Sequence, residues 1–251
     1  MKDKSVLLVD NSNTRTKFRL FSQGNISGEM RVLDTDKIHT DNLTHLLCGW
    51  QFDEVLVSSV VPESVPVIMS SLQVPVRCVG VPDALPFVDF STYPGANTLG
   101  ADRIANSVAL AEKKIFPAIA IDIGTAITFD VINVNANGSP YFMGGIIAPG
   151  LGPLKACLSH KTALLPTVSL QDDFPIIGRD TKQAMQGGLG MSVRGIIREI
   201  LSSIQSQFEK KIHVVATGGD ALWAYNQLSE IDEVDALLTF KGMARMLQSE
   251  R

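Results

Sequence analysis

The sequence is poor in cysteine, in aromatic residues and in histidine. Its three cysteines, Cys48, Cys78 and Cys157, are scattered among 251 residues and form no C-x-x-C pair. An odd number without ligand spacing excludes a disulfide framework and a zinc knuckle, and it favours a reducing, cytoplasmic location. Aromatic residues make up 6% of the chain, and the four histidines show no spacing typical of a metal site or a nucleophile pair.

The chain also lacks a dense basic segment and a long apolar run. It has 22 Lys and Arg against 26 Asp and Glu, which gives a formal net charge of −4. A surface for nucleic acid or anionic lipid needs clustered positive charge, so we expect neither nucleic acid nor a membrane as a partner. No stretch approaches the roughly 20 apolar residues that span a bilayer, and the first residues do not resemble a signal peptide.

The sequence does contain ample core material and an internal repeat. Apolar residues make up 45% of a chain that is long enough for one large domain or two of ordinary size. Shifting residues 7–20 by 112 positions places Asp10 on Asp122 and Thr16 on Thr128. The repeat favours two domains of one fold, and the polar stretch before Pro117 predicts domains at 1–114 and 115–251.

Each copy of the repeat is predicted to be a β-hairpin with an acid at its turn. The first turn runs from Asp10 to Thr16, and the second copy occupies Ala118 to Ile132. Small turn residues let backbone N–H groups approach an anion, and the carboxylate can hold the cation that accompanies a phosphate. Two such turns could bind a nucleoside triphosphate. Taken alone, the first turn is more typical of an Asx-type turn with no ligand, and its repetition at Asp122 reverses that preference.

A glycine-bounded segment carries a second kind of candidate. Asp102 follows Gly100 and starts a predicted helix that runs towards Lys113. The carboxylate is either a helix-start acid stabilised by the dipole, or a general base with Arg103 beside it to bind an anionic substrate group. Two strand-end serines, Ser58 and Ser59, are interpreted as ordinary serines rather than as direct participants in chemistry.

Two further residues have both a structural and a functional interpretation. Asp122 is flanked by Ile121 and Ile123, where a carboxylate is costly unless a cation or hydrogen-bond donors satisfy it. Thr181 is either the cap of a helix, a role that Asp180 could also fill, or a hydroxyl facing a substrate.

The periodicity of the remaining segments predicts their secondary structure. We expect helices over 39–49, 151–160, 191–208 and 235–246, strands over 54–61, 74–79, 141–150 and 214–220, an irregular connection over 82–90, and an extended segment over 164–168.

Taken together, the segments resemble the type III pantothenate kinases, which belong to the acetate and sugar kinase, heat-shock protein and actin superfamily. Six motifs of that family occur in order, at Asp10 to Lys17, Ser58 to Pro62, Gly100 to Arg103, Asp122 to Asp130, Gly144 to Gly150, and Thr217 to Gly219. The resemblance implies an α/β fold with two duplicated ribonuclease H-like (actin-like ATPase) domains, each a mixed five-stranded sheet flanked by helices.

The resemblance also implies an activity: transfer of the γ-phosphoryl group of ATP to the primary hydroxyl of pantothenate, the first step towards coenzyme A. Asp102 would be the catalytic base, kept ionised by its place at a helix start. Mg²⁺ would accompany ATP, Asp122 would hold a monovalent cation, K⁺ or NH₄⁺, and the protein would be a homodimer. The implied ATP-binding residues are Asp10, Asn11, Ser12, Asn13, Thr14, Arg15, Thr16, Lys17 and Thr125, and the implied substrate-binding residues are Tyr93, Gly100, Ala101, Asp102, Arg103 and Thr181.

One residue departs from the family pattern. Ser12 stands where the family has glycine, and a side chain there would cost about 1 kcal/mol if the backbone needed a positive φ. Two alternatives therefore stay open. The first is a non-catalytic binding or regulatory relative, although a pure binder has no need of Asp10, Asp102 and Asp122 together. The second is a sugar or acetate kinase, although such enzymes are usually longer.

Overall fold

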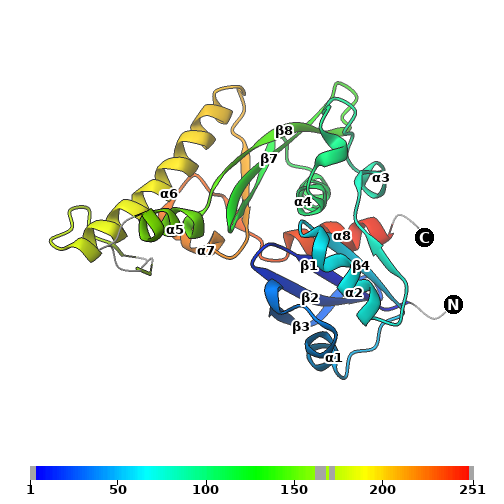
Figure 1. Cartoon of the computed structure of the whole chain (residues 1–251). Coiled ribbons are helices and arrows are strands. Elements are labelled where there is room, and N and C mark those ends of the chain that lie inside the picture. Colours follow the sequence, from blue (N-terminus) through cyan, green and yellow to red (C-terminus); the bar gives the residue numbers. More distant parts are fainter. Residues whose placement is uncertain (1–3, 162–167, 170–172, 249–251) are drawn as a thin grey trace. The chain divides into compact units, whose positions relative to one another are not determined.

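The computed structural model describes residues 4–161, 168–169 and 173–248 (Figure 1). Contacts between Cα atoms divide the chain into two compact units. The first unit contains residues 1–114, 134–143 and 237–251, and the second contains 115–133 and 144–236. The domain division at 1–114 and 115–251 stays a prediction.

The first unit is built on a five-stranded mixed sheet. Its strands are β1 (Val6–Asn11), β2 (Arg15–Ser22), β3 (Asn25–Asp34), β4 (Glu54–Ser59) and β5 (Val76–Cys78), in the order β3-β2-β1-β4-β5. β1, β2 and β3 are antiparallel neighbours, whereas β4 pairs in parallel with both β1 and β5. The carboxyl ends of β1 and β4 therefore lie together at one edge of the sheet.

Alternation along β1 and β4 assigns the two faces of this sheet. Leu7, Val9, Val55 and Val57 form a core with side chains of α1 (Thr40–Leu47) and α2 (Val65–Ser71). The opposite face, which carries Asp10, is the side on which α4 (Ala101–Glu112) and α8 (Leu238–Gln248) pack. These two helices contact β4 and β1 respectively and lie side by side in Figure 1.

The second unit repeats the same strand order. Its sheet consists of β6 (Ala118–Ile123), β7 (Ala126–Val134), β8 (Pro140–Pro149), β9 (His213–Thr217) and β10 (Glu233–Val234), in the order β8-β7-β6-β9-β10. The first residues of β8, up to Met143, belong to the first unit. β6 is antiparallel to β7 and parallel to β9, as β1 is to β2 and β4. The duplicated α/β fold expected from the repeat is confirmed.

The core of the second unit lies between the sheet and its helices. Ile119, Ile121 and Phe129 pack with Leu189 and Val193 of α6 (Thr181–Gln205), and α5 (Leu151–Lys161) and α7 (Ala221–Gln227) complete the layer. The first unit also contains α3 (Val81–Ala84) and the 3₁₀ turns Thr35–Lys37, Pro62–Ser64 and Ala96–Thr98.

Several elements differ from the sequence prediction. The helix predicted over 191–208 starts ten residues earlier and is the single helix α6. Its glycines hid this continuity because glycine disfavours helix, yet Gly187 and Gly190 pack so closely on Pro175 and Phe174 that an added Cβ would lie within 2.5 Å of them. Tertiary packing therefore overrides the local preference.

The other differences concern short or exposed elements. α3 lies in the segment predicted to be irregular, and α2, α7, β3 and β10 were not predicted. β3 has no buried residue and therefore lacks the apolar alternation that identifies a strand. The extended segment expected over 164–168 falls outside the described residues except for Val168.

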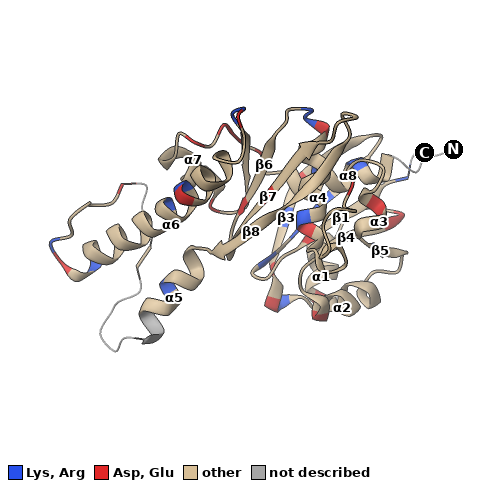
Figure 2. Ribbon diagram, turned by 90° about the horizontal axis from the view of Figure 1, so that it is seen from above, with Lys and Arg blue, Asp and Glu red and all other residues tan. Residues whose placement is uncertain are grey.

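Charged residues are distributed over both units. Figure 2 shows Lys and Arg interspersed with Asp and Glu along the helices and loops. Among the helices that the structure describes, none combines the length and apolar composition needed to cross a bilayer.

Candidate active site

Asp10 is the centre of a row of three polar side chains across the first sheet. It pairs with Lys17 on β2 and with Ser58 on β4. Side chains of directly paired residues share one face of a sheet. The Lys17 ammonium lies 3.1 Å from Asp10 Oδ2, and the Ser12 hydroxyl donates to Asp10 Oδ1 at 3.2 Å. The carboxylate is 4% exposed, and its charge is balanced by a lysine of the same hairpin.

A buried hydrogen-bond network holds the turn between β1 and β2. Asn11 Nδ2 donates to Thr16 Oγ1 at 2.8 Å, and Asn11 Oδ1 accepts from the Ser59 and Ser64 hydroxyls at 2.6 Å each. Thr35 Oγ1 donates to the Ser12 carbonyl at 2.6 Å. The side chains of Asn11 and Thr16 therefore support the turn, and their roles in ATP binding stay predictions.

The tip of the same turn is open to solvent. Asn13, Thr14 and Arg15 are exposed, in contrast to the buried pair beneath them. Ser12 does not need a left-handed backbone, because among the described residues other than glycine only Gln23 and Lys114 have positive φ. The serine in place of the family glycine is therefore accommodated without backbone strain at that position.

Asp102 lies in the first turn of α4, as the sequence predicted. Its Oδ1 accepts a hydrogen bond from the Arg103 backbone N–H at 2.7 Å. A Cβ at Gly100 would lie 2.6 Å from the same oxygen, so a side chain at position 100 would require the carboxylate to leave this position. Burial raises the pKa of Asp102 most strongly, and the negative charge of Asp10 raises it further. These effects outweigh the hydrogen bond from Arg103, which lowers it.

Aromatic side chains contact Tyr93 and Arg103, two further residues predicted to bind substrate. Tyr93 meets the Phe142 ring edge-on at a centroid distance of 5.0 Å, and Phe90 stacks on Phe142 at 5.5 Å. The Arg103 guanidinium carbon lies 5.8 Å from the centroid of the same ring, and the side chain is buried. The first unit thus brings Tyr93 and Arg103 together around Phe142.

The second unit carries the equivalent row around Asp122. Asp122 pairs with Thr128 on β7 and with Thr217 on β9. The ungapped alignment that placed Thr16 on Thr128 is wrong beyond the turn, because the second turn is one residue shorter. The register gives Thr128 the place of Lys17, so the two rows are Lys17, Asp10, Ser58 and Thr128, Asp122, Thr217.

Backbone packs closely around the Asp122 hairpin. Gly218 has φ of +97°, and a Cβ there would lie 2.5 Å from Asp122 Oδ1. Gly150 donates its N–H to the Thr125 carbonyl at 3.0 Å, and a Cβ at Gly150 would lie 2.0 Å from the Gly124 carbonyl oxygen. The Thr125 residue is exposed beside this contact.

Thr181 is the first residue of α6 and is exposed. The cap is Asp180, whose Oδ1 accepts from the Gln183 backbone N–H at 2.8 Å. The capping role that the sequence left open between the two residues therefore belongs to Asp180, which leaves the Thr181 hydroxyl available for a ligand.

The donor set suits a cation that arrives with a nucleotide. Within the described residues there is no group of three or more His, Cys, Asp and Glu side chains that could hold a metal. Mg²⁺ commonly binds through one or two carboxylates, substrate phosphates and retained waters. Asp10 and the unpartnered hydroxyl of Ser58 beside it fit that pattern.

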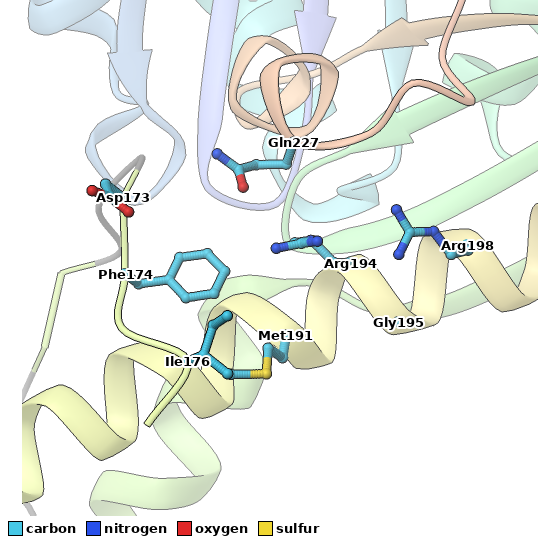
Figure 3. Close-up of a pocket in the computed structure, with 8 residues that line it drawn as sticks. All are labelled: Asp173, Phe174, Ile176, Met191, Arg194, Gly195, Arg198 and Gln227. Carbon is cyan, nitrogen blue, oxygen red and sulfur yellow. The ribbon is translucent and has the colours of Figure 1, made fainter. Parts of the chain in front are cut away.

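A separate cavity of about 480 Å³ lies along α6 of the second unit (Figure 3). Phe174 lines one side, and Arg194 and Arg198 extend from α6 on the other, with Gln227 nearby. None of the residues predicted to bind ATP, substrate or a cation lines it.

Two positioning residues escaped the sequence analysis. Phe142 lies in β8 just before the Gly144 to Gly150 motif, and its contacts are with Tyr93 and Arg103, which are 49 and 39 positions away in the sequence. Ser64, which donates to Asn11, lies two residues beyond Pro62, the last residue of the Ser58 to Pro62 motif. No local pattern marks either residue, because both act through long-range packing.

Two sheets of identical strand order, each with an acid at its first hairpin, define the actin-like ATPase fold. Solved structures agree. A conserved protein from Campylobacter jejuni, described as a Baf family transcriptional activator, has a TM-score of 0.63 at 21% identity, covering 97% of this chain and 98% of that one. The activator of 2-hydroxyisocaproyl-CoA dehydratase from Clostridium difficile, with bound ADPNP, has a TM-score of 0.51 at 13% identity, covering 99% and 98%.

The sequence places the chain within one family of that class. The family model of type III pantothenate kinase matches residues 6–203. The type III pantothenate kinase of Akkermansia muciniphila is 37% identical over 238 residues, which is 94% of this chain and 96% of the relative. This chain belongs to the type III pantothenate kinase family, whose members phosphorylate pantothenate with ATP at the start of coenzyme A biosynthesis.

Proposed function

We propose that this protein transfers the γ-phosphoryl group of ATP to the primary hydroxyl of pantothenate, with Asp102 as the general base. Family membership supports the reaction. The observation that carries the assignment of the base is the position of Asp102: a carboxylate at the start of α4, close enough to Asp10 for that charge to raise its pKa.

The raised pKa suits proton transfer. A base whose pKa lies nearer to neutral accepts a proton more readily than an ordinary exposed aspartate. The sequence suggested that the helix start would keep Asp102 ionised as a weak base, whereas burial raises the pKa of Asp102 and favours its neutral form. Phosphoryl transfer depends mainly on alignment and charge neutralisation, so a moderate base is sufficient.

The turn between β1 and β2 is assigned to the nucleotide. Its exposed tip, Asn13 to Arg15, would contact the phosphates, while Asn11 and Thr16 hold the turn rigid from below. Lys17 neutralises Asp10 and adds positive charge at this edge. When bound, Mg²⁺ supplies charge neutralisation of the β- and γ-phosphate oxygens. Thr125, which is exposed, is also proposed as an ATP-binding residue.

The segment around Asp102 is assigned to pantothenate. The backbone of Gly100 and Ala101 leads directly into Asp102, whose carboxylate is the proposed base. Arg103 would pair with the anionic substrate group. Tyr93 and Arg103 are held against Phe142, which limits their freedom before the substrate arrives. Thr181, whose residue is exposed at the start of α6, is proposed separately as a substrate-binding residue.

The monovalent cation, K⁺ or NH₄⁺, is assigned to Asp122. The first row holds a lysine opposite its acid, whereas the second row holds Thr128, a hydroxyl ligand for a hard cation. Thr128 Oγ1 is buried and has no hydrogen-bond partner. A bound cation would give that oxygen a partner.

A cytoplasmic homodimer completes the proposal. The cysteines Cys48, Cys78 and Cys157 are free and exposed, which suits a reducing compartment. Ile176 and Ile177 are 83% and 82% exposed on the second unit, and large apolar side chains at such exposure suit a protein interface.

A coupled assay of ADP release tests the function. We expect turnover that requires pantothenate and rises on adding K⁺ or NH₄⁺ to a Na⁺ buffer. Calorimetry with ADP and with pantothenate separates the non-catalytic alternative, because a pure binder would bind either ligand without turnover. A lack of pantothenate-dependent ADP release in K⁺, with both ligands bound, would overturn the kinase assignment.

A further inference from the structure

The hydroxyl of Ser58 is buried without a partner at the edge of the site. Ser58 is 1% exposed, and its Oγ has no hydrogen-bond partner. The two other serines of this region behave differently, since Ser59 and Ser64 both donate to Asn11 Oδ1 at 2.6 Å. Leaving a hydroxyl buried and unsatisfied costs about 1–3 kcal/mol. An unsatisfied hydroxyl at the edge of the candidate site indicates a ligand that would supply the missing hydrogen bond.

The register places this hydroxyl beside Asp10. Ser58 is the direct partner of Asp10 in the parallel ladder, and neighbouring strands lie about 4.8 Å apart. Asp10 Oδ1 accepts from Ser12 and Oδ2 from Lys17. Each carboxylate oxygen has two lone pairs, so both can accept one more hydrogen bond.

The same face of the sheet leads towards Asp102. Val60 follows Ser58 by two residues, and its Cγ1 lies 3.4 Å from the point where a Cβ of Gly100 would sit. That point is also 2.6 Å from Asp102 Oδ1. Ser58 is therefore the direct strand partner of Asp10 and lies two residues before the Val60 side chain that approaches the Gly100 to Asp102 segment.

The chemistry of the expected cation fits the free acceptors. Mg²⁺ keeps several of its waters, and a metal-bound water is a strong donor of two hydrogen bonds. One such water could donate to Asp10 and to Ser58 Oγ together. An apolar residue at position 58 would leave only the carboxylate to orient that water.

We propose that Ser58 is a positioning residue that accepts a hydrogen bond from a water of the nucleotide-bound divalent cation, a water also bound by Asp10. The inference rests on the proposed function, which assigns the nucleotide to this edge. In the second unit, the buried residue Thr217 holds the same register position beside Asp122, so a hydroxyl-bearing residue stands next to the acid in both copies.

The test is Ser58→Ala in the full chain, with Mg²⁺ titrated at saturating ATP and pantothenate. We expect the half-saturating Mg²⁺ concentration to rise about three- to tenfold, the effect of losing one hydrogen bond. The kcat at saturating Mg²⁺ and the KM for pantothenate should change less than about threefold. Ser58→Cys, which keeps the size and a weak acceptor, should lie between wild type and Ser58→Ala.

A readout independent of activity uses Mn²⁺ as the probe. Electron paramagnetic resonance of free Mn²⁺ in the presence of ADP should show weaker binding to Ser58→Ala than to wild type. The ligand-free melting temperature of Ser58→Ala should not fall, because the lost hydroxyl has no partner in the protein. The control is Ser70→Ala on α2, whose hydroxyl donates only to the Val67 carbonyl at 3.2 Å, and it should leave metal binding unchanged.

Contrary outcomes are distinct. A lower melting temperature in Ser58→Ala with wild-type Mg²⁺ and Mn²⁺ dependence would assign the serine to folding and overturn the inference. Wild-type protein that binds Mn²⁺ with ADP but does not phosphorylate pantothenate would overturn the proposed function instead, and the Mn²⁺ comparison would still decide the role of Ser58.

Discussion

At the scale of single residues, the proposed site depends on Asp102, a carboxylate whose surroundings disfavour its charged form. Asp102 is buried near a second acid, and both conditions favour its neutral form. Because its folded-state pKa is raised above the ordinary value of 3.8, ionising it costs stability at every pH above that raised value. A group that is retained at such a cost suits catalysis better than it suits folding.

Asp102→Asn should therefore separate activity from stability. We expect ADP release to fall by a factor of about 10²–10⁴, the usual contribution of a general base. The melting temperature should rise at pH 8, because the neutral amide avoids burial of charge and repulsion by Asp10. This gain should shrink as pH falls through the raised pKa and vanish below the unfolded-state pKa.

Activity and melting curves of both proteins between pH 3 and pH 8 check this prediction. The matched control is Asp53→Asn, an acid at the far end of β4, whose side chain accepts from the Ser5 backbone N–H. It should leave turnover near the wild-type level. Unchanged turnover in Asp102→Asn would remove that residue from catalysis.

The role of a residue could be predicted when it depends on sequence neighbours, and could not when it depends on residues far away in the sequence. Asp10 and Asp102 could be identified from their own neighbours, since a strand end and a helix start are local patterns. The pKa of Asp102 could not, because it depends on burial and on an acid 92 positions away in the sequence. The support that Asn11 gives the turn could not be predicted either, because its hydrogen bonds to Thr16, Ser59 and Ser64 exist only in the folded sheet.

At the scale of elements, the crossing of α4 and α8 fixes the position of Asp102. Gly242 of α8 lies directly on α4, where an added Cβ would be 1.8 Å from the Ala105 carbonyl oxygen. Thr239 Oγ1 donates to Asn106 Oδ1 at 2.9 Å in the same interface. The helix that carries the proposed base is thus held by backbone contact and by a buried hydrogen bond.

Gly242→Ala should lower the free energy of unfolding by at least about 2 kcal/mol, because the methyl group would force the helices apart. Urea denaturation checks the loss. The matched control is Gly195→Ala in α6, where a Cβ would meet nothing within 4 Å. That exchange should raise stability by about 0.5–1 kcal/mol through helix propensity. Equal stability of the two variants would contradict the close crossing.

Element prediction succeeded where a short apolar run is buried on both faces of a sheet. β1 and β6, which carry Asp10 and Asp122, are buried along nearly their whole length, whereas β3 has no buried residue and α6 contains glycines that only tertiary contact explains. Local sequence therefore specifies β3 and α6 only weakly, because the residues against which they pack lie elsewhere in the chain.

At the scale of the whole molecule, the internal repeat predicted the duplicated fold but not how the segments combine. The first unit contains 237–251 in addition to the N-terminal residues. The sequence also did not reveal that the second hairpin turn is one residue shorter than the first, because Thr16 and Thr128 are both threonines and align without a gap. Only the register shows that Lys17, not Thr16, matches Thr128. Slipping a strand by one residue exchanges its faces, which is why the error matters.

Native-state hydrogen exchange tests this division. Amides of α8 should open together with those of α4, with the same dependence on low concentrations of denaturant. Amides of α6 and β9 should form a separate group. Exchange of α8 in step with β9, rather than with α4, would contradict the assignment of 237–251 to the first unit.

The return of α8 to the first unit has a consequence for synthesis. A ribosome delivers the chain from its N-terminus, and domains commonly fold in that order. Here the unit that contains residue 10 also needs residues 237–251, which are made after every residue of the second unit. The half of the protein translated first is therefore the half completed last. The second unit can therefore fold before α8 is available to cover the strands of the first unit.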